Sequence, residues 1–173
     1  MTKSPDTYLH EPVMLRETVE LLSPVSGGLY CDGTAGRGGH SQALLEASAP
    51  DGLVISIDRD PEAVEAVRER LAPFGERSVV LHGRFGALRD ILDERGIDRV
   101  DGILVDLGVS SPQLDDSARG FSFQQDGPID MRLDPSRGET ALDVIEMLSE
   151  EDLANGIYEF GEERKSRRIA RAL

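Results

Sequence analysis

Three aspartates stand at the ends of short apolar runs. Asp32 and Asp58 each close such a run, and Asp106 lies near the end of another. Runs of this kind form buried strands, and in an open α/β sheet the ligand binds beyond the carboxyl ends of the strands. We therefore expect these carboxylates to gather at one edge of a sheet. A carboxylate there accepts hydrogen bonds from a ligand, each worth about 1.5–3 kcal/mol.

A glycine-rich loop, Gly33 to Gly39, follows the first of these runs. Glycine allows positive φ and a close approach of the backbone to a ligand. No Lys follows any of the glycines, which excludes a phosphate-binding P-loop, and their spacing does not match the dinucleotide pattern G-x-G-x-x-G. Two interpretations remain: a loop beneath the sulfonium and amino-acid end of S-adenosylmethionine, or a glycine-rich entry to the helical pattern at 40–47 that binds nothing.

The composition limits the class of protein. The chain has 173 residues, with 33 acidic and 19 basic side chains and a net charge of −14. This charge argues against broad binding to a nucleic-acid backbone, so any such contact is expected to be local. The single cysteine, Cys31, excludes an internal disulfide and is expected to be buried. Because there is no apolar run of about 18 residues and no signal-like start, we predict a cytoplasmic protein that does not enter a membrane.

The order of the elements predicts an α/β domain with a parallel sheet. Strands are expected at 29–32, 53–58, 78–82 and 102–107. Helices are expected at 8–22 (flanking the sheet), at 40–47, from Pro61 with Asp60 as its N-cap, and at 87–95. From Val109 to Gly138 the pattern stops. It turns helical again from Thr140, with a capping box beginning at Ser149 and a last helix at 162–173.

Two positions have the chemistry of a nucleoside site. Asp58 comes 20 residues after Gly38, the spacing at which a carboxylate at the second strand accepts bonds from ribose hydroxyls. Phe85, just beyond the third strand, could offer a flat face to adenine, although a core role fits it equally well.

The segment after the fourth strand should line the acceptor side of the pocket. It begins with Asp106, and its residues Ser110, Ser111, Pro112 and Gln113 partly match the Asp/Asn/Ser-Pro-Pro-aromatic motif of amino-methyltransferases, without the second proline and the adjacent aromatic residue. An aromatic side chain is missing from that motif, so we expect any stacking on a splayed base to come from the long segment that follows, from Phe121 or Phe123. The five cations between Arg164 and Arg171 fit a solvated helix face and a phosphate contact equally well.

Five blocks of sequence together carry a specific resemblance. They are residues 8–15, 32–41, 58–61, 106–115 and 119–132, the last without its intervening residues 124–126. With these motifs, in this order, the chain resembles the bacterial 16S ribosomal RNA (cytosine-N4)-methyltransferase family. The resemblance implies a Rossmann-like class I methyltransferase core that uses S-adenosylmethionine, needs no metal and methylates a cytosine amine in 16S ribosomal RNA or the small ribosomal subunit.

The resemblance also implies site residues and a division of the chain. By position, the family's cofactor contacts fall on Gly38, Gly39, His40, Asp58, Phe85, Asp106 and Gln113. Asp106 and the segment Ser110-Ser111-Pro112 would orient the amine. Residues 1–113 would form the cofactor-binding core with its first four strands, 114–138 a substrate-side loop, and 139–173 the start of an inserted helical domain.

Family members are longer than this chain, so the resemblance implies that it is their N-terminal part. The fourth strand would then be an unpaired apolar edge, and a homodimer is one way to cover it. Two alternatives to an active methyltransferase remain: a chain that binds S-adenosylmethionine without methylating anything, and a nucleotide-dependent oxidoreductase. The irregular glycine spacing and the absence of a recognisable hydride-transfer pair weigh against the oxidoreductase.

Overall fold

The computed structural model describes residues 12–173. The chain divides into two compact units, of which the first ends at Gly108 and the second begins at Val109. The predicted boundaries at 113 and 138 concern the organisation of the longer family members and stay a prediction.

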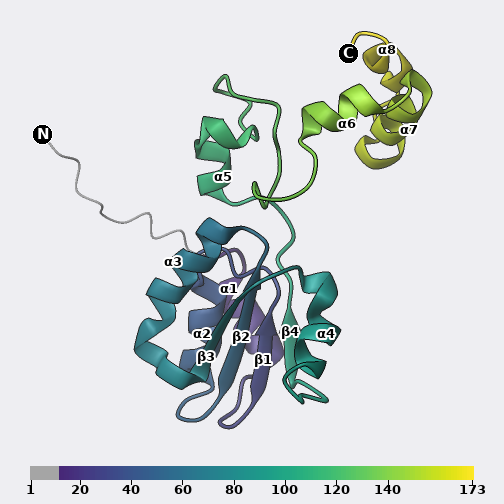
Figure 1. The fold of residues 1–173 in the computed structure, drawn as a ribbon. Helices are drawn as coiled ribbons and strands as arrows, with labels where there is room; N and C mark the ends of the chain where they lie inside the picture. The colour runs from purple at the N-terminus through teal and green to yellow at the C-terminus, as the bar shows by residue number, and fades with distance from the viewer. Residues whose placement is uncertain (1–11) are drawn as a thin grey trace, which may run out of the picture. The chain divides into compact units, whose positions relative to one another are not determined.

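The first unit contains a four-stranded parallel sheet in the order β3-β2-β1-β4 (Figure 1). Its strands are β1 (Leu29–Asp32), β2 (Leu53–Asp58), β3 (Ser78–His82) and β4 (Gly102–Leu104). The first three have the predicted bounds. The fourth is shorter than the predicted 102–107, because its only described neighbour, β1, ends at Asp32, which pairs with Leu104. Beyond Leu104 the chain has no strand to continue the ladder.

Helices cover both faces of this sheet. The helices of the unit are α1 (Leu15–Leu22), α2 (Gly39–Ala47), α3 (Pro61–Leu71) and α4 (Leu88–Asp93), with 3₁₀ turns η1 (Ala72–Arg77) and η2 (Phe85–Ala87). The predicted N-cap of α3 is confirmed, since the Asp60 carboxylate accepts the Glu62 amide at 3.0 Å. The prediction of helix at 87–95 overran both ends of α4. Of the predicted helix at 8–22, residues 8–11 lie outside the described residues, and the helix itself begins at Leu15.

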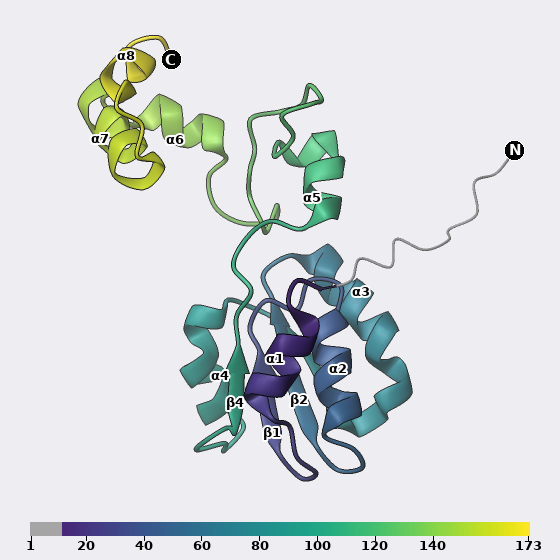
Figure 2. The same ribbon diagram turned by 180° about the vertical axis from the view of Figure 1, so that it is seen from behind.

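Alternation along the strands divides the core into two clusters. Tyr30 and Val54 face α2 and α3 and pack with Leu44 and Leu45. Cys31, Ile55 and Ile57 point to the other face, where they meet Leu92 of α4. Figures 1 and 2 show α4 beside β4 and α1 to α3 on the opposite side of the sheet. The predicted burial of Cys31 is confirmed, and burial, followed by the nearby Asp32, raises the pKa of its thiol to about 11.

The edge strand β4 exposes apolar side chains, as predicted. Ile103 is 51% exposed, and Leu107, just beyond the strand, is 72% exposed. In the described part of the chain β4 pairs with β1 alone. The homodimer remains a prediction. None of the helices in residues 12–173 is long and apolar enough to cross a membrane.

The second unit is a looped segment followed by three helices. Its elements are α5 (Ser111–Asp115), η3 (Ser117–Arg119), α6 (Ala141–Met147), α7 (Glu150–Gly161) and α8 (Ser166–Ala170). Half of the capping box predicted at Ser149 is confirmed, because its hydroxyl accepts the Asp152 amide at 3.1 Å. The Asp152 carboxylate accepts a bond from that hydroxyl at 2.6 Å, in place of one from the Ser149 amide. The predicted helix at 162–173 is wrong in extent. The backbone turns at Glu162, whose φ is 52°, and only the short α8 follows.

Candidate functional site

The carboxyl ends of β1, β2 and β4 form the candidate site. The strand order places the first strand in the middle, with β2 on one side and β4 on the other, so the chain passes from β3 at one edge to β4 at the far edge. A reversal of this kind opens a crevice beyond the strand ends, where ligands of open α/β sheets bind. The predicted gathering of Asp32, Asp58 and Asp106 at one edge follows from this topology.

Backbone hydrogen bonds fix the glycine loop between β1 and α2. The amide of Gly33 donates to the Leu104 carbonyl of β4 at 2.9 Å, and the amide of Ala35 donates to the Ile57 carbonyl of β2 at 3.0 Å. Gly36 and Gly38 have φ values of 54° and 77°, the left-handed region that glycine adopts without strain. The loop is therefore tied to both neighbours of β1 and has little freedom.

The Asp58 carboxylate holds the glycine loop by hydrogen bonding. Its Oδ2 accepts the Gly36 amide at 2.7 Å and its Oδ1 accepts the Asp60 amide at 2.9 Å. A carboxylate offers about four lone-pair positions. These two contacts leave capacity for two further hydrogen bonds, which suits a pair of neighbouring hydroxyl groups. The side chain is half-buried, so it is both held and reachable.

Asp32 lies deeper than Asp58 and is fully buried. The Ser41 hydroxyl of α2 donates to its Oδ2 at 2.7 Å, and the Thr34 amide donates to its Oδ1 at 3.2 Å. Ser56 of β2 in turn donates to the Ser41 hydroxyl at 2.8 Å. Burial raises the pKa of the Asp32 carboxyl, and the bonds from Ser41 and Thr34 oppose that effect. Asp32 therefore serves the framework of the site.

The Asp106 side chain is exposed beyond the end of β4. Its backbone amide donates to the Thr34 hydroxyl at 2.7 Å. Thr34 is not among the site residues predicted from the sequence. The only signal was its position, a hydroxyl residue two places after the aspartate that ends β1.

Phe85 and His40 have different surroundings. Phe85, at the start of η2, is 46% exposed, and a Cβ on Gly33 would lie 2.8 Å from the Phe85 Cβ. Gly33 thus lets Phe85 approach the loop. The ring of His40 is buried, and its Nε2 lies 3.1 Å from the Val13 carbonyl. The His40 ring therefore holds the segment before α1. A ligand in the site would contact this residue through its backbone atoms.

The predicted acceptor residues after Asp106 belong to the second unit. Ser110 caps α5, and the Gln113 side chain accepts the Ser110 amide at 2.9 Å, which completes a capping box. Ser111 and Pro112 form the first turn of this helix. Gln113 is buried. Its local role is therefore to hold α5, a role that the sequence pattern S-x-x-Q could have indicated.

Hydrogen bonds from two arginines, Arg119 and Arg132, hold the segment after α5. Arg119 is buried and donates to the carbonyls of Arg132 and Leu133 at 3.2 and 2.9 Å. The Arg132 guanidinium donates two hydrogen bonds to the Asp130 carboxylate, at 2.9 and 2.6 Å. These bonds, and a third from the Arg132 amide, lower the pKa of Asp130 to about 2. Of the two predicted stacking residues, Phe123 is fully exposed and Phe121 is half-buried.

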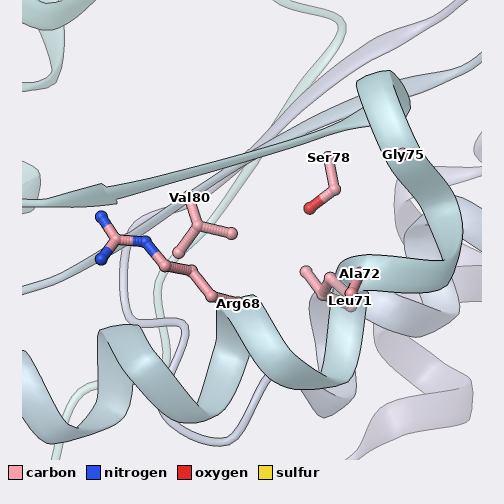
Figure 3. Close-up of a pocket in the computed structure, with 6 residues that line it drawn as sticks. All are labelled: Arg68, Leu71, Ala72, Gly75, Ser78 and Val80. Atoms are coloured by element: carbon pink, nitrogen blue, oxygen red, sulfur yellow. The ribbon is translucent and has the colours of Figure 1, made fainter.

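A small hollow of about 170 Å³ lies elsewhere in the first unit. Figure 3 shows its lining, which comes from the end of α3, from η1 and from β3. It includes Ser78, the first residue of β3, so it extends to the amino end of that strand. Parallel sheets bind ligands at the opposite end. We therefore assign the candidate site to the strand tips. Among residues 12–173 no cluster of side chains could hold a metal ion.

The family model described as "MraW methylase family" matches residues 7–173. The chain belongs to the MraW methylase family. A curated relative from Geotalea uraniireducens, named ribosomal RNA small subunit methyltransferase H, is 55% identical over 163 residues, 94% of this chain and 52% of the relative. A protein of the same name from Alcanivorax borkumensis is 49% identical over 173 residues, 100% of this chain and 55% of the relative.

These matches confirm the resemblance predicted from the motifs. The chain spans about half the length of the curated MraW relatives it matches. Among solved structures it is similar to an S-adenosylmethionine-dependent O-methyltransferase from Thermotoga maritima, with a TM-score of 0.43 and 20% identity, over 62% of this chain and 38% of that one. Membership of the MraW family rests on the sequence matches.

Proposed function

We propose that the chain is the cofactor-binding part of an S-adenosylmethionine-dependent methyltransferase that modifies the N4 amine of a cytosine in 16S ribosomal RNA. The observation that carries this proposal is the Asp58 carboxylate. This carboxylate accepts a hydrogen bond from the glycine loop and another from the Asp60 amide, so it can accept two more from a ligand. It lies at the strand ends of a chain of the MraW family.

The residues present fit S-adenosylmethionine. Its ribose offers two hydroxyls to Asp58, and its lack of phosphate agrees with a loop that carries no Lys. The bent backbone at Gly36 and Gly38 allows a close approach. The residues that we propose to hold the cofactor are Gly38, Gly39, His40, Asp58, Phe85, Asp106 and Gln113. When bound, the cofactor supplies a methyl group on a sulfonium centre. The neutral thioether that remains after methyl transfer is a good leaving group, so the transfer needs no metal.

The acceptor amine needs help from the protein. Its lone pair is delocalised into the cytosine ring, so the nitrogen is a poor nucleophile. Acceptor groups that draw its N–H bonds and hold the nitrogen in line with the methyl carbon and sulfur lower the barrier. We assign this orienting role to the Asp106 carboxylate and to the backbone at Ser110, Ser111 and Pro112. Phe123 is the exposed ring best suited to stack on the base or a neighbour.

The proposed substrate sets the partner and the place of action. The curated relatives are named for the RNA of the small ribosomal subunit. We propose that the protein binds 16S ribosomal RNA or the small subunit, and therefore works in the cytoplasm. The C-terminal cations, all exposed from Arg164 to Arg171, offer local positive charge in a chain of net charge −14.

Transfer of a labelled methyl group tests the proposal. Purified protein, labelled S-adenosylmethionine and unmethylated 16S ribosomal RNA or small subunits should yield N4-methylcytosine, identified by mass spectrometry of the nucleosides. Asp106→Asn should lower kcat by about tenfold or more, because it removes the charge that holds the amine.

The control is Asp98→Asn, at an exposed carboxylate in the loop before β4. Cofactor binding without any methyl transfer to either substrate would favour the alternative of a binding chain without activity. Saturable binding of a nicotinamide cofactor would favour the oxidoreductase.

A further inference from the structure

Thr34 joins two strand ends that are 72 residues apart in the sequence. Its hydroxyl accepts the Asp106 amide at 2.7 Å, and its own amide donates to the Asp32 carboxylate at 3.2 Å. One residue thus connects the buried acid at the end of β1 with the backbone of the exposed acid beyond β4.

The Thr34 hydroxyl provides a hydrogen-bond acceptor that a paired strand would otherwise provide. Regular pairing between β1 and β4 ends at Asp32 and Leu104, and the Gly33 amide makes one more bond, to the Leu104 carbonyl. From Val105 to Leu107 the chain is exposed and continues without a paired strand. Within this stretch the Thr34 hydroxyl accepts the Asp106 amide, as a carbonyl of the ladder would do.

The other end of Thr34 is anchored. Asp32 is fully buried and also accepts the Ser41 hydroxyl of α2 at 2.7 Å. Ser41 accepts the Ser56 hydroxyl of β2 at 2.8 Å. These buried bonds tie Thr34 to α2 and β2 as well as to β1. Bonds of this kind are stronger where water is excluded, so the anchor is rigid.

We infer that Thr34 is a positioning residue, which fixes the backbone at Asp106 so that the Asp106 carboxylate is held ready for the cofactor and the acceptor amine. This inference rests on the proposed function for the role of Asp106. The link between Thr34 and Asp106 itself rests on geometry alone. Thr34 acts through Asp106 and touches neither reactant in this account.

Amide hydrogen exchange tests the link without any ligand. Thr34→Val keeps the shape of the side chain and removes the acceptor oxygen, whereas Thr34→Ser keeps the oxygen. We expect the Asp106 amide to exchange roughly tenfold faster in Thr34→Val and to keep its protection in Thr34→Ser, as the loss of one hydrogen bond predicts. The Gly33 amide, bonded to Leu104, is the internal control and should not change. Unchanged exchange at Asp106 in Thr34→Val would overturn the inference.

A double-mutant cycle tests whether Thr34 affects cofactor binding through Asp106. We expect Thr34→Val to weaken S-adenosylmethionine binding by roughly 2–10-fold, as one lost hydrogen bond predicts, and to have no further effect in an Asp106→Ala background. Thr34→Ser should restore the affinity. Equal effects of Thr34→Val in both backgrounds would mean a merely structural role and would overturn the inference.

The cycle also separates the inference from the proposed function. If the folded wild-type chain fails to bind S-adenosylmethionine, or if Asp58→Ala binds it as well as the wild type, the proposed function fails, and with it the purpose assigned to Thr34. The exchange experiment would still decide whether Thr34 fixes the Asp106 backbone. If Asp58→Ala weakens binding while Thr34→Val does not, the inference alone fails.

Discussion

The two units of the chain hold their shape by different means. In the sheet unit, large apolar side chains such as Leu44, Leu45 and Ile55 are fully buried on both faces of the strands. In the described residues of the second unit the only buried apolar side chains are Ala154 and Ala170, while Arg119 and Asp134 are buried with polar partners. The sheet unit is thus stabilised mainly by hydrophobic burial, and the second unit by polar contacts and close backbone packing.

This difference predicts different weak points. A unit held by burial is sensitive to cavities in its core. A segment held by carboxylate and guanidinium contacts is sensitive to backbone fit and to protonation. Two substitutions and a change of pH test this difference between the units.

Removal of core volume should have the largest effect. Ile55→Ala in the middle of β2 leaves a cavity under α4 and should destabilise the sheet unit by about 3 kcal/mol, measured by chemical denaturation. Ile103→Ala on β4 is the matched control and should cost less than about 1 kcal/mol, because this side chain is half exposed. Equal costs at the two positions would contradict the division of the sheet into a packed interior and an open edge.

A methyl group at Gly120 should disrupt the second unit. Gly120 and Gly138 both have a φ of 76°, but a Cβ on Gly120 would lie 2.8 Å from the Asp130 nitrogen, while a Cβ on Gly138 would meet nothing within 4 Å. Both changes to Ala cost about 1 kcal/mol for the backbone conformation. Gly120→Ala should cost about 1–2 kcal/mol more for overpacking.

Exchange at the Met131 amide, which donates to the Arg119 carbonyl at 3.1 Å, reports this effect. It should accelerate far more in Gly120→Ala than in Gly138→Ala. If both variants exchange alike, the close contact at Gly120 does not hold the segment.

Acid should loosen the second unit by a smaller amount. The Arg132 guanidinium holds the pKa of Asp130 at about 2, below the value near 3.9 expected for an unfolded chain. Stability from this pair is therefore complete above about pH 4 and is lost as the pH falls toward 2. The protection of the Arg132 amide, which donates to Asp130 at 2.9 Å, should fall over this range once the intrinsic pH dependence of exchange is corrected for, and it should already be lower in Asp130→Asn.

The control for this prediction is Asp126→Asn, at an exposed carboxylate of the same segment. It should behave as the wild type. The same pH dependence in Asp130→Asn would show that another group is responsible.

The sequence predicted the parts of the fold that depend on local pattern. The bounds of β1 to β3 and the cap at Asp60 follow from apolar runs and from the preferences of Asp and Pro, which are readable within a few residues. The end of β4 was not predictable in this way. Val105 and Leu107 are typical strand residues, but pairing at this point depends on where β1 ends.

The candidate site shows the same limit. The meeting of Asp32, Asp58 and Asp106 at one edge follows from parallel strand order, which alternation of strands and helices predicts. The bond between Thr34 and Asp106 joins residues 72 apart, and no local pattern indicates it. In the segment 109–138, α5 and η3 are too short for a helical period, and the Arg119 clamp depends on carbonyls 13 and 14 residues away.

The most direct test of the proposed site is a calorimetric titration of the chain with S-adenosylmethionine, with Asp58→Ala as the comparison and circular dichroism to show that both are folded. Ser26→Ala, at an exposed position near the start of β1, is the control variant. The account predicts saturable binding that weakens by about tenfold or more in Asp58→Ala, as the loss of a bond to a charged acceptor requires, and is unchanged in Ser26→Ala. Equal affinity of the wild type and Asp58→Ala, or no binding by the folded wild-type chain, would contradict it.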